Sequence, residues 1–300
     1  MSWASKLSKP YRIETGKNFR LDDFDPAATG HLRSKQNAQK LLDESIAGMA
    51  KLQDKLYAQD RWAVLLIFQA MDAAGKDGAI KHVMSGLNPQ GCQVYAFKTP
   101  SAEELNHDFL WRTTKCLPER GHIGIFNRSY YEEVLVVRVH SDILKNERIP
   151  KELLGRRLWQ DRFEDICNFE RYLSRNGIII RKFFLHLSKK EQKRRFLARL
   201  DTPNKNWKFS LSDVRERQCW NDYMSAYEEM IAATSTKHSP WYVVPADNKW
   251  YTRLVVAAAV VDTLQMLQLE YPEVDPAKEQ ELAAARAELE GKKSPAASES

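Results

Sequence analysis

Residues 61–84 read RWAVLLIFQAMDAAGKDGAIKHVM. The segment opens with the unbroken apolar run Trp62–Phe68, whose length and large or β-branched side chains are typical of a strand buried on both faces. A turn of small residues follows, and then an apolar helical pattern through Ile80, Val83 and Met84. A strand, a glycine–lysine turn and a helix in this order predict a phosphate-binding loop, because the turn and the helix N-terminus present backbone N–H groups to an anion.

The turn Ala70–Gly78 departs from the Walker A pattern G-x-x-x-x-G-K-[ST] at two positions. Ala70 stands where the first glycine is usual, and Asp77 replaces the Ser/Thr whose hydroxyl normally binds Mg²⁺. We still expect this loop to bind phosphate through its backbone and its lysine. The expected contacts are Ala73, Ala74, Gly75, Lys76, Asp77, Gly78 and, in the helix, Lys81.

Asp72 lies inside the loop, where a carboxylate repels a bound phosphate unless a metal ion or a transferable proton lies between them. We therefore interpret Asp72 as a metal ligand or a base. The alternative is that Asp72 and Asp77 only cap the following helix, which is an ordinary role for aspartate at a helix start.

Composition favours one large α/β domain with insertions, since 300 residues with 43% hydrophobic content can bury a sizeable core. The net charge of +6 is unevenly distributed. Residues 181–217 hold twelve Lys/Arg and four Asp/Glu, whereas residues 273–300 hold four Lys/Arg and seven Asp/Glu. A strongly basic segment in a chain with a phosphate-binding loop indicates a polyanionic partner.

The cysteines and the apolar runs favour a soluble cytoplasmic protein without a membrane partner. Cys92, Cys116, Cys167 and Cys219 are far apart and lack C-x-x-C spacing, so we expect buried thiols in a reducing compartment. The N-terminal residues lack an apolar signal core, and the longest apolar run, residues 254–261, is too short to cross a bilayer.

Five strand-like segments alternate with helical segments. We expect strands at residues 62–68, 91–97, 122–127, 178–187 and 241–246, and helices at 34–60, 151–176 and 249–269. A further helix is expected from Ser101, which forms a capping-box pattern with Glu104. This alternation predicts a five-stranded parallel sheet flanked by helices, with ligands at the carboxyl ends of the strands.

We divide the chain into three parts. Residues 1–33 lack periodicity and are expected to form an extended arm that lies on the core. Residues 34–270 are expected to form the α/β domain, and residues 271–300 a disordered or weakly helical acidic tail. Residues 188–237, which we name the basic insert, carry no strand signal. We expect the basic insert to form helices that act as a mobile lid over bound phosphates.

The third expected strand ends at Asn127, where a nucleotide-hydrolysing P-loop protein has an Asp that binds Mg²⁺. An amide there leaves the metal to other ligands, and the candidates are Asp72 and Glu132 or Glu133. The alternative is that both glutamates are solvated charges at the start of a helix, where the helix dipole favours acidic side chains. Arg128 directly follows the strand, so its guanidinium can reach a phosphate; a surface ion pair is its alternative.

The basic insert supplies positive charge in quantity. Arg195 and Arg199 lie four residues apart and share a helical face, with Arg194 beside them. We expect at least some of Arg194, Arg195, Arg199 and Lys208 to contact phosphate. The alternative is a basic helix that is simply solvated.

Three motifs together resemble the family-2 polyphosphate kinases: QAMDAAGKDG (69–78), IFNRSYYE (125–132) and NWKF (206–209). The resemblance covers roughly residues 19–271 and includes SPWY at 239–242. It implies a P-loop kinase fold similar to thymidylate kinase. It also implies dependence on Mg²⁺, which Mn²⁺ could replace, and a homodimer or homotetramer.

The resemblance further implies transfer of the terminal phosphate of inorganic polyphosphate to a nucleotide. Asn127, where many members have Asp, and Glu132 after two tyrosines are similar to the class III branch, which phosphorylates both AMP and ADP. We therefore expect catalytic roles for Asp72, Lys76, Asn127 and Arg128, and metal binding by Asp72 with Glu132 or Glu133.

Two other functions fit parts of the pattern. An ATP-dependent nucleoside or nucleotide kinase shares the loop and the lid, but it does not explain the excess positive charge or Asp72. A nucleic-acid-binding P-loop protein predicts aromatic residues interleaved with basic ones for base stacking. The only large aromatic residues in the segment 188–208 are Phe196 and Trp207, so we expect no nucleic-acid partner.

Overall fold

The computed structural model describes residues 2–32 and 35–291, without the side chains of Asn37, Lys205, Trp207 and Lys208. The chain divides into a core unit, Met1–Leu269, and a C-terminal unit, Glu270–Ser300. The boundary that we expected between arm and domain, at residues 33 and 34, lies outside the described residues.

Six strands form one sheet in the order β1-β6-β5-β2-β4-β3. Their bounds are β1 Arg12–Ile13, β2 Ala63–Gln69, β3 Cys92–Ala96, β4 Ile123–Asn127, β5 Ile178–His186 and β6 Trp241–Pro245. The pairs among β2 to β6 are parallel, whereas β1 is antiparallel to β6. The expected α/β fold is confirmed, but the count of five strands was wrong, because a two-residue edge strand leaves no periodic signal.

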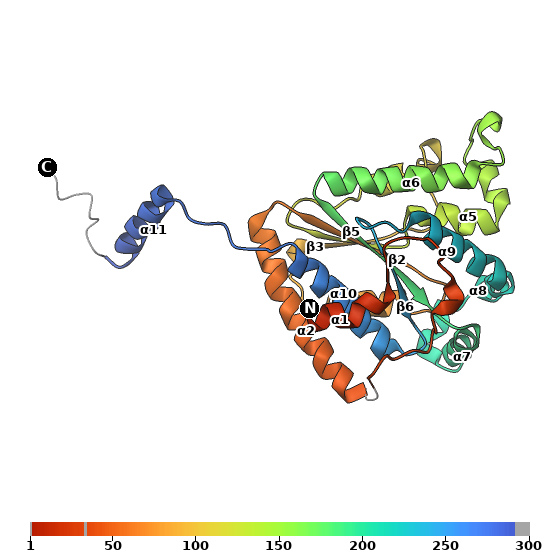
Figure 1. The fold of residues 1–300 in the computed structure, drawn as a ribbon, viewed down its shortest axis with the longest axis horizontal. Helices are drawn as coiled ribbons and strands as arrows, with labels where there is room; N and C mark the ends of the chain where they lie inside the picture. The colour runs from red at the N-terminus through yellow and green to blue at the C-terminus, as the bar shows by residue number, and fades with distance from the viewer. Residues whose placement is uncertain (1, 33–34, 292–300) are drawn as a thin grey trace. The chain divides into compact units, whose positions relative to one another are not determined.

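Helices cover both faces of this sheet (Figure 1). One face carries α1 (Trp3–Ser8), α2 (Lys35–Gln59), α3 (Lys76–Val83) and α10 (Lys249–Met266); the other carries α6 (Leu158–Arg175) and α9 (Trp220–Thr234). Strand β2 lies between β5 and β4, and all seven of its residues are buried. Burial on both faces explains why a continuous apolar run identified this strand.

The N-terminal segment packs against the rest of the core unit, as we expected, but it is not simply extended. It contains α1, the 3-10 helix η1 (Lys9–Tyr11), β1 and the 3-10 helix η2 (Leu21–Asp23). The backbone N–H of Asp247 donates to the carbonyl of Pro26 at 3.0 Å. A Cβ on Gly16 would lie 1.6 Å from the carbonyl oxygen of Ala232, so the passage of the chain beside α9 requires glycine.

Two expected helices begin differently from the prediction. Ser101 and Glu104 do form the capping box, but it opens only the 3-10 helix η4 (Glu104–Asn106). The helix expected from residue 151 begins at Leu158 as α6, after η7 (Lys151–Leu153) and Gly155, a poor helix former. The other short elements are η3 (Pro89–Gly91), α4 (Trp111–Thr114), η5 (Tyr130–Val134), α5 (Val136–Val139) and η6 (Ser141–Asn146).

The basic insert contains two kinds of structure. Helices α7 (Lys189–Leu200), η8 (Pro203–Lys208), α8 (Leu211–Glu216) and η9 (Arg217–Cys219) follow the carboxyl end of β5. Helix α9 instead packs on the sheet through the buried side chains of Tyr227, Met230 and Ile231. Helix α9 therefore belongs to the core and not to the expected lid, for which only residues 188–219 of the basic insert remain.

The C-terminal unit contains a helix, which agrees with the second of the two alternatives that we expected, a disordered or a weakly helical tail. Helix α11 spans Pro276–Leu289, and its N-cap Asp275 accepts a hydrogen bond from the N–H of Lys278 at 2.8 Å. None of its residues is buried, and residues 292–300 of the expected tail lie outside the described residues.

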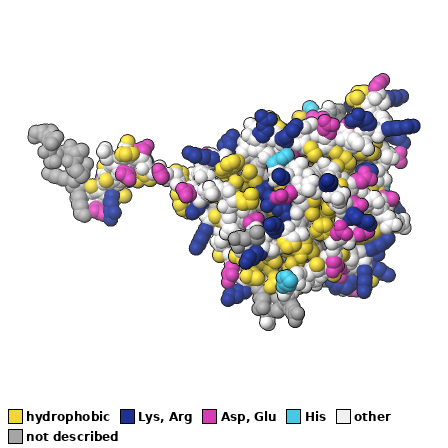
Figure 2. Space-filling view, viewed as in Figure 1, with side chains coloured by type: hydrophobic (Ala, Val, Ile, Leu, Met, Phe, Trp, Pro, Cys, Tyr) yellow, Lys and Arg dark blue, Asp and Glu magenta, His cyan; other side chains and the backbone are white. Residues whose placement is uncertain are grey.

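Charged side chains of both signs are interspersed over the face shown in Figure 2. In the described part of the chain, no helix has the length and hydropathy needed to cross a membrane.

All four cysteines are free thiols, but each is only partly buried, so the expectation of buried thiols was wrong.

Candidate active site

The loop between β2 and α3 has the backbone conformation of an anion site. Ala73 and Gly75 have φ angles of 64° and 103°, and Gly75 is the left-handed N-cap of α3. Helix α3 starts at Lys76, so the first N–H groups of the helix, which lack intrahelical partners, lie at this loop. The predicted contacts at residues 73–78 therefore meet at one helix N-terminus.

The side chain of Lys76 reaches back across the loop from the start of α3. Its ammonium donates a hydrogen bond to the carbonyl of Ala70 at 2.6 Å. Burial lowers the pKa of Lys76, while the carboxylates of Asp72, Glu132 and Asp77 act to raise it. A positive charge thus lies beside the helix N-terminus, as a phosphate-binding loop requires.

Asp72 and Arg128 meet across the ends of β2 and β4. The guanidinium of Arg128 lies 3.3 Å from Asp72 Oδ1, and both side chains remain more than one-third exposed. Burial acts to lower the pKa of Arg128, but the carboxylates of Glu132 and Asp72 outweigh it and raise this pKa. The capping alternative does not describe Asp72, because α3 is capped by the backbone at Gly75 and Asp72 faces an arginine.

Asp77 and Asn127 form a direct pair. Asn127 Nδ2 donates to Asp77 Oδ1 at 2.8 Å. The usual P-loop arrangement has a Ser or Thr hydroxyl at the start of the helix and an Asp at the end of the strand. Here the acid, Asp77, is on the helix, and the neutral side chain, Asn127, is on the strand. The amide suits this position, since a second carboxylate there would repel Asp77.

The structure separates the two candidate glutamates. Glu132 faces the loop: burial raises its pKa, and the nearby charges of Arg128 and Lys76 oppose that effect. Glu133 instead forms a buried ion pair with Arg162 at 3.1 Å. Burial, reinforced by Glu147, raises the pKa of Glu133 to about 7. Glu132 is therefore the better candidate for a ligand beside Asp72.

Arg195, which we expected to contact phosphate, binds the protein's own backbone. Its side chain is only 5% exposed. Its guanidinium donates to the carbonyls of Ala73, Ala74, Ala246 and Asp247 and to the carboxylate of Glu191. These contacts use all five N–H donors of an arginine, so none remains for a phosphate.

Gln192 reinforces this attachment from the same helix. Its amide donates to the carbonyl of Asp72 at 3.0 Å and accepts from Arg217. The start of α7 is thus bound to the phosphate loop and is not a freely moving lid. The sequence concealed this role because a buried arginine and a solvated one look alike in a basic run.

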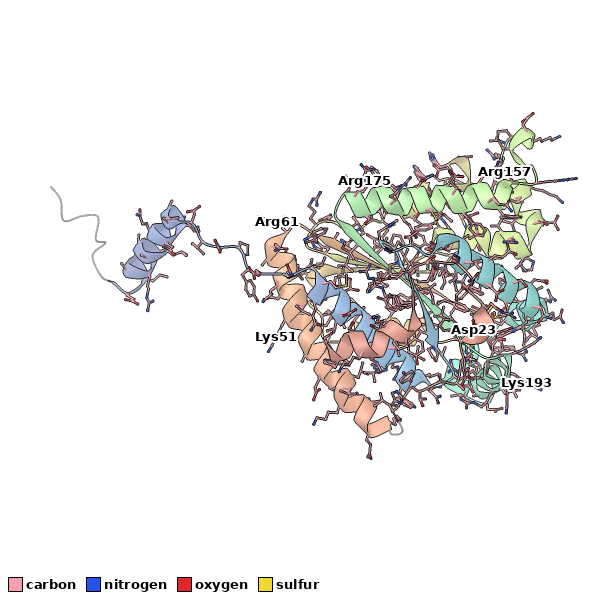
Figure 3. All side chains as sticks on the ribbon, viewed as in Figure 1. Asp23, Lys51, Arg61, Arg157, Arg175 and Lys193 are labelled. Atoms are coloured by element: carbon pink, nitrogen blue, oxygen red, sulfur yellow. The ribbon has the colours of Figure 1, made fainter. Side chains whose placement is uncertain are left out.

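The remaining cations of the prediction are more exposed. Arg194 is 69% exposed and pairs with Glu191, Arg199 lies 3.6 Å from Asp213, and Lys81 is exposed on α3. The side chain of Lys208 lies outside the described part of the structure. Lys193 projects outward from α7 (Figure 3).

A cavity of about 760 Å³ opens beside Arg128 and Glu132. Its other walls include Phe97, Phe109 and Arg112, together with residues from 143–165. Arg112 is buried and donates to the carbonyl of Lys98 at 2.7 Å. Sequence analysis missed this cavity because its walls come from separate loops, short helices and the first turns of α6, which share no motif.

The chain matches the family model Polyphosphate kinase 2 (PPK2) over residues 32–272. This chain belongs to the polyphosphate kinase 2 family. It is 54% identical over 283 residues to the ADP-polyphosphate phosphotransferase of Rhodopseudomonas palustris, covering 94% of this chain and 98% of that one. It is 43% identical to the AMP/ADP-polyphosphate phosphotransferase of Meiothermus ruber, covering 90% and 98%.

A solved structure agrees with this assignment. The crystal structure of Polyphosphate Kinase 2 from Arthrobacter aurescens superimposes with a TM-score of 0.84 at 41% identity, covering 94% of this chain and 98% of that chain. The predicted family and its kinase fold are confirmed, and the chain is an enzyme of that family.

The polyphosphate kinase 2 site fits a metal ion that is shared with substrate. Among the described residues, no group of three or more His, Cys, Asp or Glu could hold a metal ion. Asp72 and Glu132 interact electrostatically around Lys76 and Arg128. Mg²⁺ in phosphotransfer sites commonly takes one or two carboxylates and completes its shell with water and phosphate oxygens. Two carboxylates are therefore a sufficient protein contribution.

Proposed function

We propose that this protein is a Mg²⁺-dependent phosphotransferase that moves the terminal phosphate of inorganic polyphosphate to AMP or ADP. The observation that carries the proposal is the meeting of Lys76, Asp72 and Arg128 at the loop, between a basic helical segment and a large cavity. The names of the relatives support the same donor and acceptors.

The donor and the acceptor would approach from different sides. Polyphosphate would bind at the loop and along exposed cations such as Arg194 and Lys81. The nucleotide would occupy the 760 Å³ cavity, whose volume lies in the range of small-molecule sites. Phe97 and Phe109 offer aromatic surface for a base, and Arg128 stands where the two substrates would meet.

In the transfer step, an oxygen of the acceptor's terminal phosphate attacks the end phosphorus of the chain. The bond from that phosphorus to its bridging oxygen breaks, and the shortened chain leaves with the electron pair. Lys76 and the loop N–H groups hold the donor, and Arg128 stabilises charge on the transferring group. The acceptor oxygen is already ionised, so no base is needed.

Asp72 and Glu132 would hold the metal ion, which when bound would neutralise phosphate charge. Glu133 is left out of this assignment, since its carboxylate is paired with Arg162. Asn127 would act indirectly, by holding Asp77 through its amide.

The acceptor is the finer part of the proposal. The class III resemblance favours both AMP and ADP, whereas the more similar of the two named relatives is named for ADP alone. We propose ADP as the principal acceptor and AMP as a second one. We also propose a cytoplasmic location, which the four free cysteines support. A homo-oligomer is proposed on the family resemblance alone.

The test is a set of paired incubations of the purified protein with Mg²⁺, followed by chromatography of the nucleotides. Polyphosphate with ADP should yield ATP, and polyphosphate with AMP should yield ADP. ATP offered as donor to a nucleoside should yield no nucleoside phosphate. Phosphorylation driven by ATP but not by polyphosphate would overturn the proposal.

A further inference from the structure

A fully buried ion pair lies behind the site. Lys182 on β5 and Glu170 on α6 are both 0% exposed, and their charged atoms are 2.6 Å apart. Figure 3 labels Arg157 and Arg175 at the two ends of α6. Neither Lys182 nor Glu170 borders the cavity, so neither can touch a substrate there. Because burying two charges costs free energy, this pair calls for a reason beyond stability.

Two tyrosines complete the network around the pair. The hydroxyls of Tyr130 and Tyr131 both donate to Glu170 Oε1, at 2.9 and 2.7 Å. Lys182 donates to Glu170 Oε2, to the hydroxyl of Tyr131 at 3.0 Å and to the carbonyl of Thr234 at 2.8 Å. All three ammonium donors are therefore used, and the network is satisfied within the protein.

The tyrosines connect this network to the site through the sequence Arg128-Ser129-Tyr130-Tyr131-Glu132. Both tyrosines lie in η5 (Tyr130–Val134), a short 3-10 helix that begins directly after Ser129. The hydroxyl of Ser129 accepts from the N–H of Tyr131 at 3.2 Å. Arg128 has a φ of 65°, a conformation that is unfavourable for an arginine. The segment thus needs external contacts to hold its shape.

A second contact fixes the other side of the same segment. The side-chain amide of Gln69 is oriented so that its nitrogen and its oxygen both have hydrogen-bond partners. The nitrogen donates to the carboxylate of Glu132 at 2.8 Å, and the oxygen accepts from the hydroxyl of Ser129 at 3.1 Å. Gln69 is the last residue of β2 and is fully buried. The segment is therefore held by β2 on one side and by the buried pair on the other.

We propose that Lys182 and Glu170 are positioning residues, which act through Tyr130 and Tyr131 to hold Arg128 and Glu132 against the phosphate loop. This inference rests on the roles of Arg128 and Glu132 in the proposed function. It assigns the two tyrosines of the RSYYE motif to the support of the site.

A stability role predicts a different result from a positioning role. Replacing a buried ion pair by apolar residues of similar volume is often neutral or stabilising. If the pair only held the fold together, an apolar network that folds equally well would leave turnover unchanged. If it positions Arg128 and Glu132, turnover should fall although the protein stays folded.

The experiment replaces every polar side chain of the network at once, in the variant Tyr130→Phe, Tyr131→Phe, Glu170→Leu and Lys182→Met. We expect a thermal midpoint close to that of the wild type. We expect kcat to fall by about tenfold or more, with KM for ADP and for polyphosphate changed by less than about threefold. Unchanged kcat in the folded variant would overturn the inference.

Arg181→Met is the matched control, because Arg181 is the neighbouring buried cation on β5 and donates instead to Thr263. It should leave kcat unchanged whatever its effect on the thermal midpoint. If the variant with four substitutions does not fold, a double variant is used in its place. It carries Tyr130→Phe and Tyr131→Phe and keeps the ion pair. A threefold or larger fall in kcat supports the inference, and a smaller change overturns it.

The wild-type protein separates this inference from the proposed function. If the wild type transfers no phosphate from polyphosphate, the proposed function fails. If the wild type is active and the variants keep its kcat, only the positioning role fails.

Discussion

Lys76 is the residue on which the phosphate-binding role depends most directly. It supplies the positive charge at the start of α3 and reaches back to the carbonyl of Ala70. Lys76→Ala should lower kcat/KM by roughly a thousandfold or more, since transfer relies on charge stabilisation at this position. Steady-state assays with polyphosphate and ADP measure this loss.

Lys51→Ala is the control for this substitution, because Lys51 is exposed on α2, outside the site (Figure 3). It should behave like the wild type. Near-normal turnover of a folded Lys76→Ala protein would show that the loop is not the phosphate site.

Asp72 tests the metal assignment. Asp72→Asn removes one carboxylate while keeping the shape of the side chain, so activity should fall by about a hundredfold or more. Raising the Mg²⁺ concentration should restore part of this activity if Asp72 acts only as a ligand. Binding of Mn²⁺ in the presence of polyphosphate, followed by electron paramagnetic resonance, should weaken in parallel. An unchanged rate and unchanged Mn²⁺ binding would contradict the assignment.

At this scale the sequence predicted which residues would gather, but not what each would contact. Asp72, Lys76 and Arg128 come together because β2 and β4 are parallel neighbours that end at the same edge. Glu133 and Arg195 were assigned by their type and spacing, and both are engaged within the protein. Whether a charged side chain faces solvent or a backbone carbonyl depends on tertiary packing, which a local sequence pattern does not contain.

Among the elements, α7 is bound directly to the phosphate loop. Arg195 from α7 binds two loop carbonyls and two carbonyls after β6, so it joins three elements at one point. Arg195→Met would leave those buried carbonyls without their partner. We expect a loss of stability of about 3 kcal/mol, seen as a fall of several degrees in the thermal midpoint.

The same substitution should also lower kcat/KM, because the loop would lose its support. Arg175→Met, the same chemical change at the exposed end of α6, is the control and should alter neither property. Equal thermal midpoints and equal activities for both variants would contradict the role of α7 in supporting the loop.

Elements with a continuous or periodic apolar pattern were predicted well, and the others were not. Strand β2 and helices α2 and α10 lie close to their expected positions. Helix α9 was taken for part of the lid, because its apolar face lies next to a strongly basic stretch in the sequence. Strand β1 has two residues, too few for any periodicity.

For the molecule as a whole, the net charge of +6 and the exposed cations near the loop predict a strong salt dependence. KM for long-chain polyphosphate should rise by about tenfold or more between 50 and 200 mM salt, because binding a polyanion releases counterions. KM for ADP, with far fewer charges, should rise much less and serves as the internal control. Equal salt dependence for the two substrates would argue against a basic binding surface.

The global architecture followed from the alternation of strands and helices, which permits few arrangements when connections are right-handed. The cavity beside Arg128 did not follow, since its walls are assembled from segments far apart in the chain. Arg181 and Lys182, counted in the basic stretch, are buried within β5 and add nothing to a surface charge.

The most direct test is a crystal structure of the protein with Mg²⁺ and a short polyphosphate chain. The account predicts one end of the chain at the N-terminus of α3, within hydrogen-bonding distance of Lys76 and the loop N–H groups, with the metal ion on Asp72. A chain bound only to the outer cations of α7, with the loop free of phosphate, would contradict it.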